Sequence, residues 1–94
     1  MVTKIEVCYY AMGSTGNIWE CNDFRILYEN VRREFRAEMH EAGVYYDYRS
    51  AVFYYGILIH EDGHRFRHVS YKEIGYLYVS GCDRRIVSCE FERM

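Results

Sequence analysis

Residues 50–71 read SAVFYYGILIHEDGHRFRHVSY, and the fold is decided by this stretch. Its two flanks are rich in β-branched and aromatic residues, which favour strands. Between them, Glu61, Asp62 and Gly63 supply the residue types of a tight turn, with Gly63 suited to a left-handed position. The stretch therefore predicts a β-hairpin, the strongest such signal in the chain.

The length of the hairpin loop sets which side chains share a face. A three-residue loop places His60 opposite His64. A two-residue loop places His60 opposite Arg65 and Ile59 opposite Phe66. A slip of one residue moves every side chain to the other face of the sheet. The sequence leaves both registers open, so any role for the histidines depends on the register.

Length and composition indicate one small folded domain. The chain has 94 residues, half of them apolar, with 11 tyrosines, no proline and a net charge of −2. We therefore expect a single domain over residues 1–94. The near-neutral charge argues against a protein that binds mainly through nucleic-acid phosphates. The four cysteines have no CxxC spacing, and no signal peptide or membrane-spanning segment is recognisable, so we expect a cytoplasmic protein with free thiols.

A long helix and a first strand precede the hairpin. Residues 3–10 alternate between apolar and polar side chains, which predicts a half-buried strand. From Asp23, a capping residue, apolar side chains recur every three or four residues as far as Ala42, and Gly43 follows at the position of a C-cap. We therefore predict a helix from about Asp23 to Ala42. The segment Val44–His60 is long for one strand, and we expect two extended pieces with a bend near residues 47–50.

The segment Ser70–Gly81 decides between two topologies. Ser70 and Glu73 form a capping-box pattern, and apolar side chains then follow at helical spacing, whereas residues 76–79 (Tyr-Leu-Tyr-Val) favour a strand. Both alternatives give an α+β fold in which one long helix covers one face of an antiparallel sheet of four to five strands. The helical alternative, our first choice, gives the ferredoxin-like order βαββαβ. The strand alternative gives βα followed by an antiparallel meander.

The sequence supports only one metal-site hypothesis. His60 and His64 lie side by side in the three-residue register and could share an ion. His68 lies four residues beyond His64, about 13 Å along a strand that rises about 3.3 Å per residue, which is too far to share it. The cysteines are not spaced as zinc ligands, and we expect them to pack as small apolar side chains. We therefore predict no cofactor and no catalytic site, and a solvated His60–His64 pair as the simpler alternative to a metal.

The second flank of the hairpin suggests a nucleic-acid site as an alternative function. Residues 64–71 (HRFRHVSY) resemble the RNP1 motif of RNA-recognition motifs at their aromatic and aliphatic positions, with arginines in place of its glycines. The resemblance implies contacts to single-stranded RNA through Arg65, Phe66, Arg67 and Tyr71. The alternative is an ordinary pattern of cross-strand pairs.

The tyrosines give the favoured functional hypothesis. Neighbouring strand residues point to opposite faces, so a single helix cannot cover both members of an adjacent tyrosine pair. Tyrosine and arginine are enriched among the residues that dominate binding energy at protein interfaces. We therefore expect a partner-binding surface that comprises Tyr45, Tyr46, Tyr48, Tyr54, Tyr55, Arg65, Phe66, Arg67 and Tyr71.

These patterns predict a small non-enzymatic binding protein. We expect it to dock on a larger protein or protein complex, or on a second copy of itself, with nucleic acid as a less favoured partner and no membrane partner. A short, proline-free, tyrosine-rich single domain is typical of the inhibitors that phages and mobile elements encode, such as anti-CRISPR and anti-restriction proteins.

Overall fold

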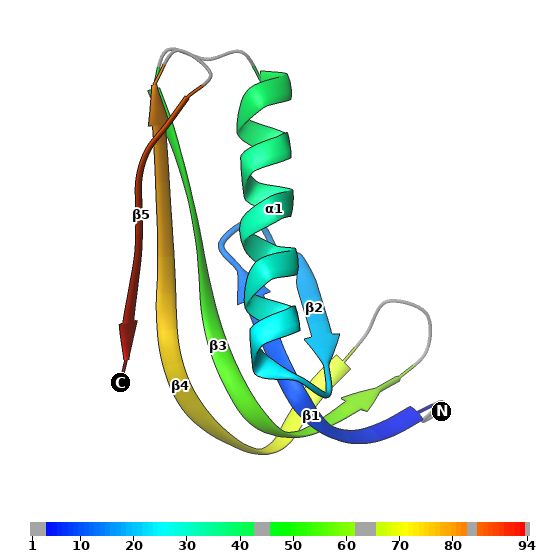
Figure 1. The fold of residues 1–94 in the computed structure, drawn as a ribbon. Coiled ribbons are helices and arrows are strands. Elements are labelled where there is room, and N and C mark those ends of the chain that lie inside the picture. The colour runs from blue at the N-terminus through cyan, green and yellow to red at the C-terminus, as the bar shows by residue number, and fades with distance from the viewer. Residues whose placement is uncertain (1–3, 43–45, 62–65, 83–84, 94) are drawn as a thin grey trace.

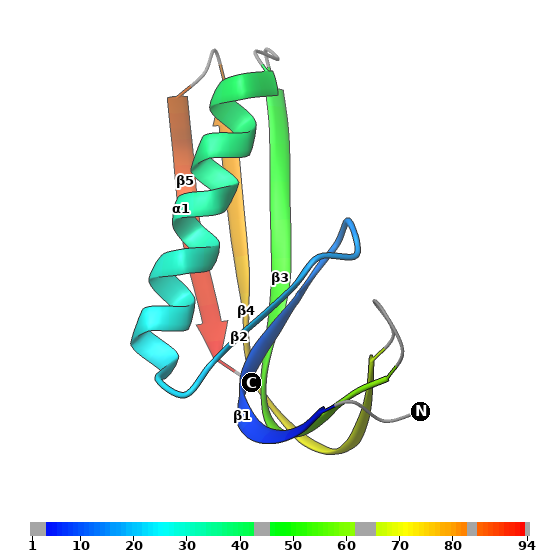
Figure 2. The same ribbon diagram turned by 90° about the vertical axis from the view of Figure 1, so that its right-hand side faces the viewer.

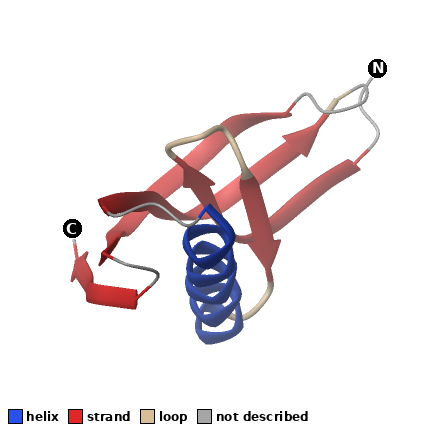
Figure 3. Cartoon of the chain, turned by 90° about the horizontal axis from the view of Figure 1, so that it is seen from above, coloured by secondary structure: helices blue, strands red, loops and turns tan. Residues whose placement is uncertain are grey.

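The computed structural model describes residues 4–42, 46–61, 66–82 and 85–93 (Figure 1). Its elements are β1 (Lys4–Gly13), β2 (Ile18–Cys21), α1 (Phe24–Ala42), β3 (Tyr46–His60), β4 (Phe66–Cys82) and β5 (Arg85–Arg93). The strands form one antiparallel sheet in the order β2-β1-β3-β4-β5, and α1 lies against one face of it (Figures 2 and 3). The α+β architecture predicted from the sequence is thereby confirmed.

Helix α1 forms where the apolar stripe predicts it. The Asp23 carboxylate accepts a hydrogen bond from the backbone N–H of Ile26 at 3.1 Å, which satisfies one of the free donors at the helix start. One face of the helix is buried against the sheet, through Leu27, Val31, Phe35 and Met39 on the helix and Ala11, Ala51, Phe53, Leu77 and Val79 on the strands. This apolar layer is the main core. No helix in the described part of the chain is long and apolar enough to cross a membrane.

Two polar contacts join α1 to the strands beside it. The indole Nε1 of Trp19 on β2 donates a hydrogen bond to Glu34 Oε2 at 2.5 Å. On β3, Arg49 Nε donates to Glu38 Oε2 at 3.2 Å. Both contacts lie at the margin of the apolar layer, so they fix the position of the helix along the sheet.

The segment Ser70–Gly81 belongs to strand β4, so the predicted second helix and the ferredoxin-like order are not observed. Its backbone pairs with β3 on one side and, from Gly75 onward, with β5 on the other. Leu77 and Val79 are buried beneath α1, while Tyr76 and Tyr78, which alternate with them, are half-buried on the opposite face. Pairing on two sides satisfies the backbone polar groups of this segment better than a short helix interrupted by glycine. The alternative prediction, βα followed by an antiparallel meander, agrees with α1 and β3–β5, but the structure has two strands before the helix where that prediction has one.

Strand β3 is one continuous element, not the two extended pieces predicted. It runs for 15 residues and is paired with the 17-residue β4 along its whole length. The irregularity lies in β4 instead, where Val69 and Ile74 have no partner on β3 and each forms a β-bulge. Continuous pairing with β4 therefore allows β3 to be longer than a strand usually is.

The register of the hairpin differs from both registers considered above. His60 pairs with Phe66 and Leu58 pairs with His68, so five residues separate the last pair. This register buries Leu58 and brings His68 next to Tyr10. His64, the expected partner of His60, lies outside the described residues.

The sheet is curled at one end. The amino-terminal part of β1, the end of β3 and the start of β4 bend away from α1, so the face opposite the helix becomes concave there (Figure 2). Bulges bend the strand that carries them, and the two bulges of β4 lie in this region. A second, smaller core fills the concave side, with Cys8, Tyr10 and Leu58 buried and Ile18 and Tyr54 packed against them.

Gly75 is required by the packing of β5 on β4. A Cβ atom at this position would lie 2.4 Å from the ring of Phe91 and 2.7 Å from the backbone oxygen of Glu92. The ring of Phe91 therefore lies directly over the glycine backbone, next to the bulge at Ile74. Gly75, which would weaken a helix in this segment, is therefore required by the packing of the two strands.

Candidate functional site

The face of the sheet opposite α1 carries a group of tyrosines. The pairs Ser50–Tyr78 and Val52–Tyr76 alternate along the β3–β4 ladder with the pair Ala51–Leu77, which lies under the helix. Their side chains therefore point away from α1. We call the following residues the tyrosine face: Tyr48, Tyr54, Tyr71, Tyr76 and Tyr78.

Three of these rings form a ladder on the flatter part of the sheet. Tyr48 and Tyr78 are stacked with their ring centroids 5.6 Å apart, and Tyr76 follows at 6.4 Å from Tyr78. The side chain of Tyr48 is 52% exposed, whereas Tyr76 and Tyr78 are half-buried. The ladder thus offers one projecting ring on a preformed aromatic surface.

The other rings of the tyrosine face surround His68 at the curled end. Tyr54 and Tyr71 lie 5.2 Å and 4.7 Å from the imidazole, measured between ring centroids. The buried hydroxyl of Tyr10 lies 2.5 Å from His68 Nδ1, and His68 Nε2 lies 3.1 Å from the sulfur of Met12. These contacts fit a neutral imidazole that accepts from Tyr10 and donates to Met12.

Burial shifts the pKa values of His68 and Tyr10. Removal from water lowers the pKa of His68 below its usual value, and it raises the pKa of Tyr10 to about 12. Both shifts favour the neutral form of each side chain. The imidazole of His68 and the phenol of Tyr10 are therefore both uncharged at neutral pH.

The structure separates the tyrosines predicted to bind a partner. Tyr48, Tyr54 and Tyr71 belong to the tyrosine face. Tyr55 is 43% exposed on the other face, where its ring lies 4.7 Å from that of Tyr9. Tyr45 lies outside the described residues, and Tyr46 is on β3 with a side chain that is not described.

The predicted RNA-binding residues do not converge in the described part of the chain. Arg67 pairs with Ile59 across the hairpin and therefore points to the face opposite His68. Its guanidinium Nε lies 2.6 Å from Glu61 Oε1, in an ion pair. Arg65 lies outside the described residues, and Phe66 is on β4 with a side chain that is not described.

Tyr55 lies at a groove on the helix side of the sheet. The groove has a volume of about 410 Å³ and opens below the start of α1. Its lining combines three aromatic rings with charged side chains of both signs: Tyr9, Phe24, Tyr55, Lys72, Glu73, Ile74 and Arg93. Lys72 and Arg93, two exposed cations of β4 and β5, therefore line this groove on the helix side of the sheet.

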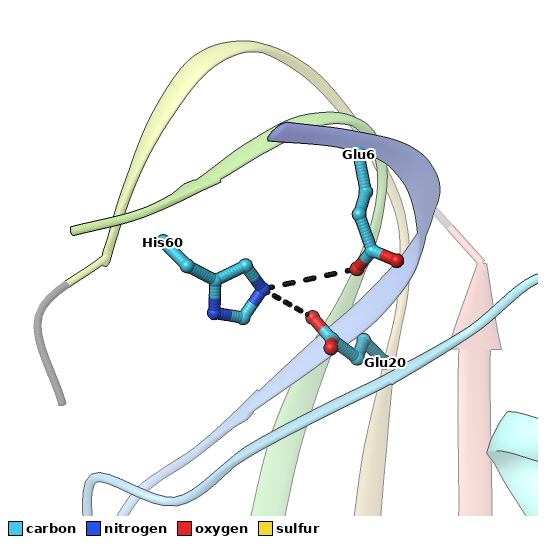
Figure 4. Close-up of side chains that lie close together, drawn as sticks. All are labelled: Glu6, Glu20 and His60. Carbon is cyan, nitrogen blue, oxygen red and sulfur yellow. Dashed lines mark hydrogen bonds and ion pairs between the residues drawn. The ribbon is translucent and has the colours of Figure 1, made fainter. Parts of the chain in front are cut away.

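A second cluster lies inside the curl, where Glu6, Glu20 and His60 converge from β1, β2 and β3 (Figure 4). The imidazole Nε2 of His60 donates to Glu20 Oε2 at 2.7 Å and lies 3.8 Å from Glu6 Oε2. One ligand atom from each residue lies within 4.8 Å of the other two. The three side chains are only 25–30% exposed. His60, one member of the predicted His60–His64 pair, thus lies beside two glutamates distant in sequence, whereas His64 lies outside the described residues.

Lys4 contacts the same carboxylates through their other oxygen atoms. Its ammonium lies 3.1 Å from Glu6 Oε1 and 3.5 Å from Glu20 Oε1. Hydrogen bonding to Glu6 raises the pKa of Lys4. Lys4 therefore faces the Oε1 atoms, while His60 faces the Oε2 atoms.

The cluster exists only because the sheet is curled. Glu20 pairs with Tyr10, and His60 pairs with Lys4. On a straight strand, these two points of β1 would lie about 20 Å apart at about 3.3 Å per residue, beyond the combined reach of the two side chains. The hydrogen bond between His60 and Glu20 thus joins the two ends of the curl.

The described cysteines are free thiols in apolar surroundings. Cys8 is buried in the smaller core, and burial raises its pKa to about 11. Cys21 and Cys89 are half-buried beside the main core. A thiol with a raised pKa holds little thiolate at neutral pH, so Cys8 is suited to packing and not to nucleophilic chemistry.

Comparisons of the chain with protein-family models, with curated proteins and with solved structures found no match. The functional argument therefore rests on the geometry of the tyrosine face and of the curl.

Proposed function

We propose that this protein is a non-enzymatic binding protein whose tyrosine face docks on a larger protein. The proposal is carried by the exposed aromatic rings of the tyrosine face. This is the face of the sheet that α1 leaves uncovered (Figure 2). Tyr48 and Tyr71 are each 52% exposed there, beside the half-buried rings that hold them in place. Tyrosines that are rigid and exposed provide large contact area at a low cost in conformational entropy.

The charge distribution favours a protein partner over a nucleic acid. Arg67 and Lys72, two cations of β4, pair with Ile59 and Tyr55 and so belong to the other face. A surface that binds phosphates needs cations directed toward the ligand. The tyrosine face instead carries the carboxylates of Glu73, Glu90 and Glu92, which pair with Tyr54, Tyr78 and Tyr76 and would repel phosphates. The narrower role of an inhibitor of the phage or mobile-element type stays a prediction from size and composition.

The test compares two faces of the same sheet. The double variant Tyr48→Ala/Tyr71→Ala removes the projecting rings of the tyrosine face, and Tyr55→Ala removes an exposed tyrosine from the opposite face. After a partner is captured by crosslinking in the native cell, its affinity for each purified variant is measured by biolayer interferometry. We expect the double variant to bind at least about tenfold more weakly, because truncation of one aromatic anchor commonly costs more than about 1 kcal/mol.

Several outcomes would contradict this proposal. If the double variant retains wild-type affinity, or if Tyr55→Ala weakens binding equally, the tyrosine face is not the docking surface. Sedimentation equilibrium of the isolated protein tests whether the partner is a second copy of the chain. A dimer that the double variant abolishes would assign the tyrosine face to that contact. Far-UV circular dichroism of each variant checks that the fold is intact.

A further inference from the structure

We propose that Glu6, Glu20 and His60 form a binding site for a divalent transition-metal ion of the zinc class. The three side chains converge from three adjacent strands on the concave side of the curl (Figure 4). They supply two carboxylate oxygens and one imidazole nitrogen, a donor set that occurs in zinc and related sites. This inference is independent of the proposed docking function.

The separations of the donor atoms suit a small ion. Bonds of about 2.1 Å from zinc to oxygen or nitrogen place tetrahedral ligands roughly 3.4 Å apart. The distances from His60 Nε2 to Glu20 Oε2 and Glu6 Oε2, 2.7 Å and 3.8 Å, bracket that value. Shifts of the glutamate side chains alone would equalise them. With its proton on Nδ1, the imidazole offers the Nε2 lone pair to the ion.

Lys4 leaves the donor atoms accessible to a cation. Its ammonium faces Glu6 Oε1 and Glu20 Oε1, whereas the oxygens that face His60 are the two Oε2 atoms. Lys4 can therefore keep its ion pairs while an ion is bound, and it orients both carboxylates as an outer-shell partner does. Water molecules would complete the coordination on the open side of the curl.

The mixed donor set predicts selectivity among ions. Imidazole favours zinc and other first-row transition metals, whereas magnesium prefers oxygen ligands in a near-octahedral arrangement. We therefore expect Zn²⁺ to bind more tightly than Mn²⁺, in agreement with the usual order of divalent affinities, and Mg²⁺ to bind weakly.

Isothermal titration calorimetry of the purified protein with ZnCl₂, MnCl₂ and MgCl₂ tests the site. We expect the wild-type chain to bind Zn²⁺, and His60→Gln and Glu20→Gln to bind it at least about tenfold more weakly, since even outer-shell changes cost that much. The matched control His40→Gln, which removes an exposed histidine of α1, should keep wild-type affinity.

A spectroscopic readout separates this site from the thiols. Co²⁺ bound by nitrogen and oxygen gives only weak visible bands, whereas thiolate ligation adds a strong near-ultraviolet band. Absence of that band, together with loss of the visible bands in His60→Gln, would support the proposal. No binding of Zn²⁺, unchanged affinity in His60→Gln and Glu20→Gln, or a thiolate band would each overturn it. Near-UV circular dichroism verifies folding, and if His60→Gln does not fold, Glu20→Gln decides the question.

Discussion

His68 illustrates how a single side chain is set by its neighbours. Its imidazole packs against the rings of Tyr54 and Tyr71, which also contact each other, and is hydrogen-bonded to Tyr10 at the curled end of the sheet. In the unfolded chain the same imidazole is solvated and titrates near its ordinary pKa of 6.5. Folding therefore changes the proton affinity of this residue.

The stability of the fold should depend on pH through His68. The folded pKa is lowered by burial, so just below pH 6.5 the unfolded chain binds more protons than the folded one. The contribution of His68 to the free energy of unfolding is therefore fully present above pH 6.5. It decreases as the pH is lowered from there toward the folded pKa. Urea unfolding followed between pH 7.5 and 5.5 should show this decrease in the wild type and a smaller decrease in His68→Gln.

The exposed His40 on α1 provides the matched control for that measurement. His40→Gln should retain the pH dependence of the wild type, because it leaves the surroundings of His68 unchanged. An identical pH dependence in His68→Gln and in the wild type would mean that the curled end does not disfavour a charged imidazole.

At the scale of elements, Gly75 connects β4 to β5. The ring of Phe91 and the backbone oxygen of Glu92 occupy the space that a Cβ atom would need. Because one of these two neighbours is backbone, a side-chain rotation cannot relieve the clash. Substitution must shift β5 relative to β4.

We expect Gly75→Ala to lower the free energy of unfolding by about 1–3 kcal/mol, the usual cost of overpacking in a core. Urea denaturation followed by circular dichroism measures the change. Glu90→Ala, an exposed position on the same β5 strand, should change stability by no more than about 0.5 kcal/mol. Equal midpoints for Gly75→Ala and the wild type would show that β5 adjusts without cost.

The elements also show how far sequence reasoning reaches. The stripe that includes Leu27, Val31 and Phe35 predicts α1, because helical spacing over five turns has few alternative explanations. In β4 the helical spacing of Ile74 and Leu77 competes with the alternation of residues 76–79, and pairing with β3 and β5 decides between them. That pairing is non-local, so the sequence of the segment alone cannot reveal it.

The sequence likewise predicts some residues of the candidate sites and misses others. Alternation along a strand is a local property, and it predicts that some tyrosines face away from α1, as Tyr48 does. Tyr76 and Tyr78 were missed because their segment was assigned to a helix, although the alternation of residues 76–79 was a usable signal. The meeting of Glu6, Glu20 and His60 depends on two bulges and a curl, which no spacing in the sequence encodes.

At the scale of the whole molecule, the two ends of the β3–β4 hairpin are unequally supported. One end lies beneath α1 with the large core and has β5 as a neighbour. At the other end β1 pairs with β3 from Lys4 to Gly13, but β2 pairs with β1 only from Tyr9 to Met12. Ile5 and Val7 are 64% and 60% exposed on that open part of β1.

Amide hydrogen exchange should therefore reveal two levels of stability. Peptides that cover residues 50–54 and 75–79 should exchange at least about tenfold more slowly than a peptide that covers residues 4–8, since regions with few buried contacts open locally. Exchange detected by mass spectrometry at neutral pH measures this difference. Uniform protection across the three peptides would mean that the curled end opens only when the whole domain unfolds.

The ion pairs of Lys4 with Glu6 and Glu20 make the curled end of the sheet sensitive to dissolved ions. Ion pairs near the surface weaken as ionic strength rises, because the screening length is about 8 Å at physiological salt. Apolar packing responds in the opposite sense to salts such as sulfate, which strengthen the burial of apolar groups. A sulfate solution would therefore weaken the ion pairs inside the curl while it strengthens both apolar layers, the smaller core of the curl included.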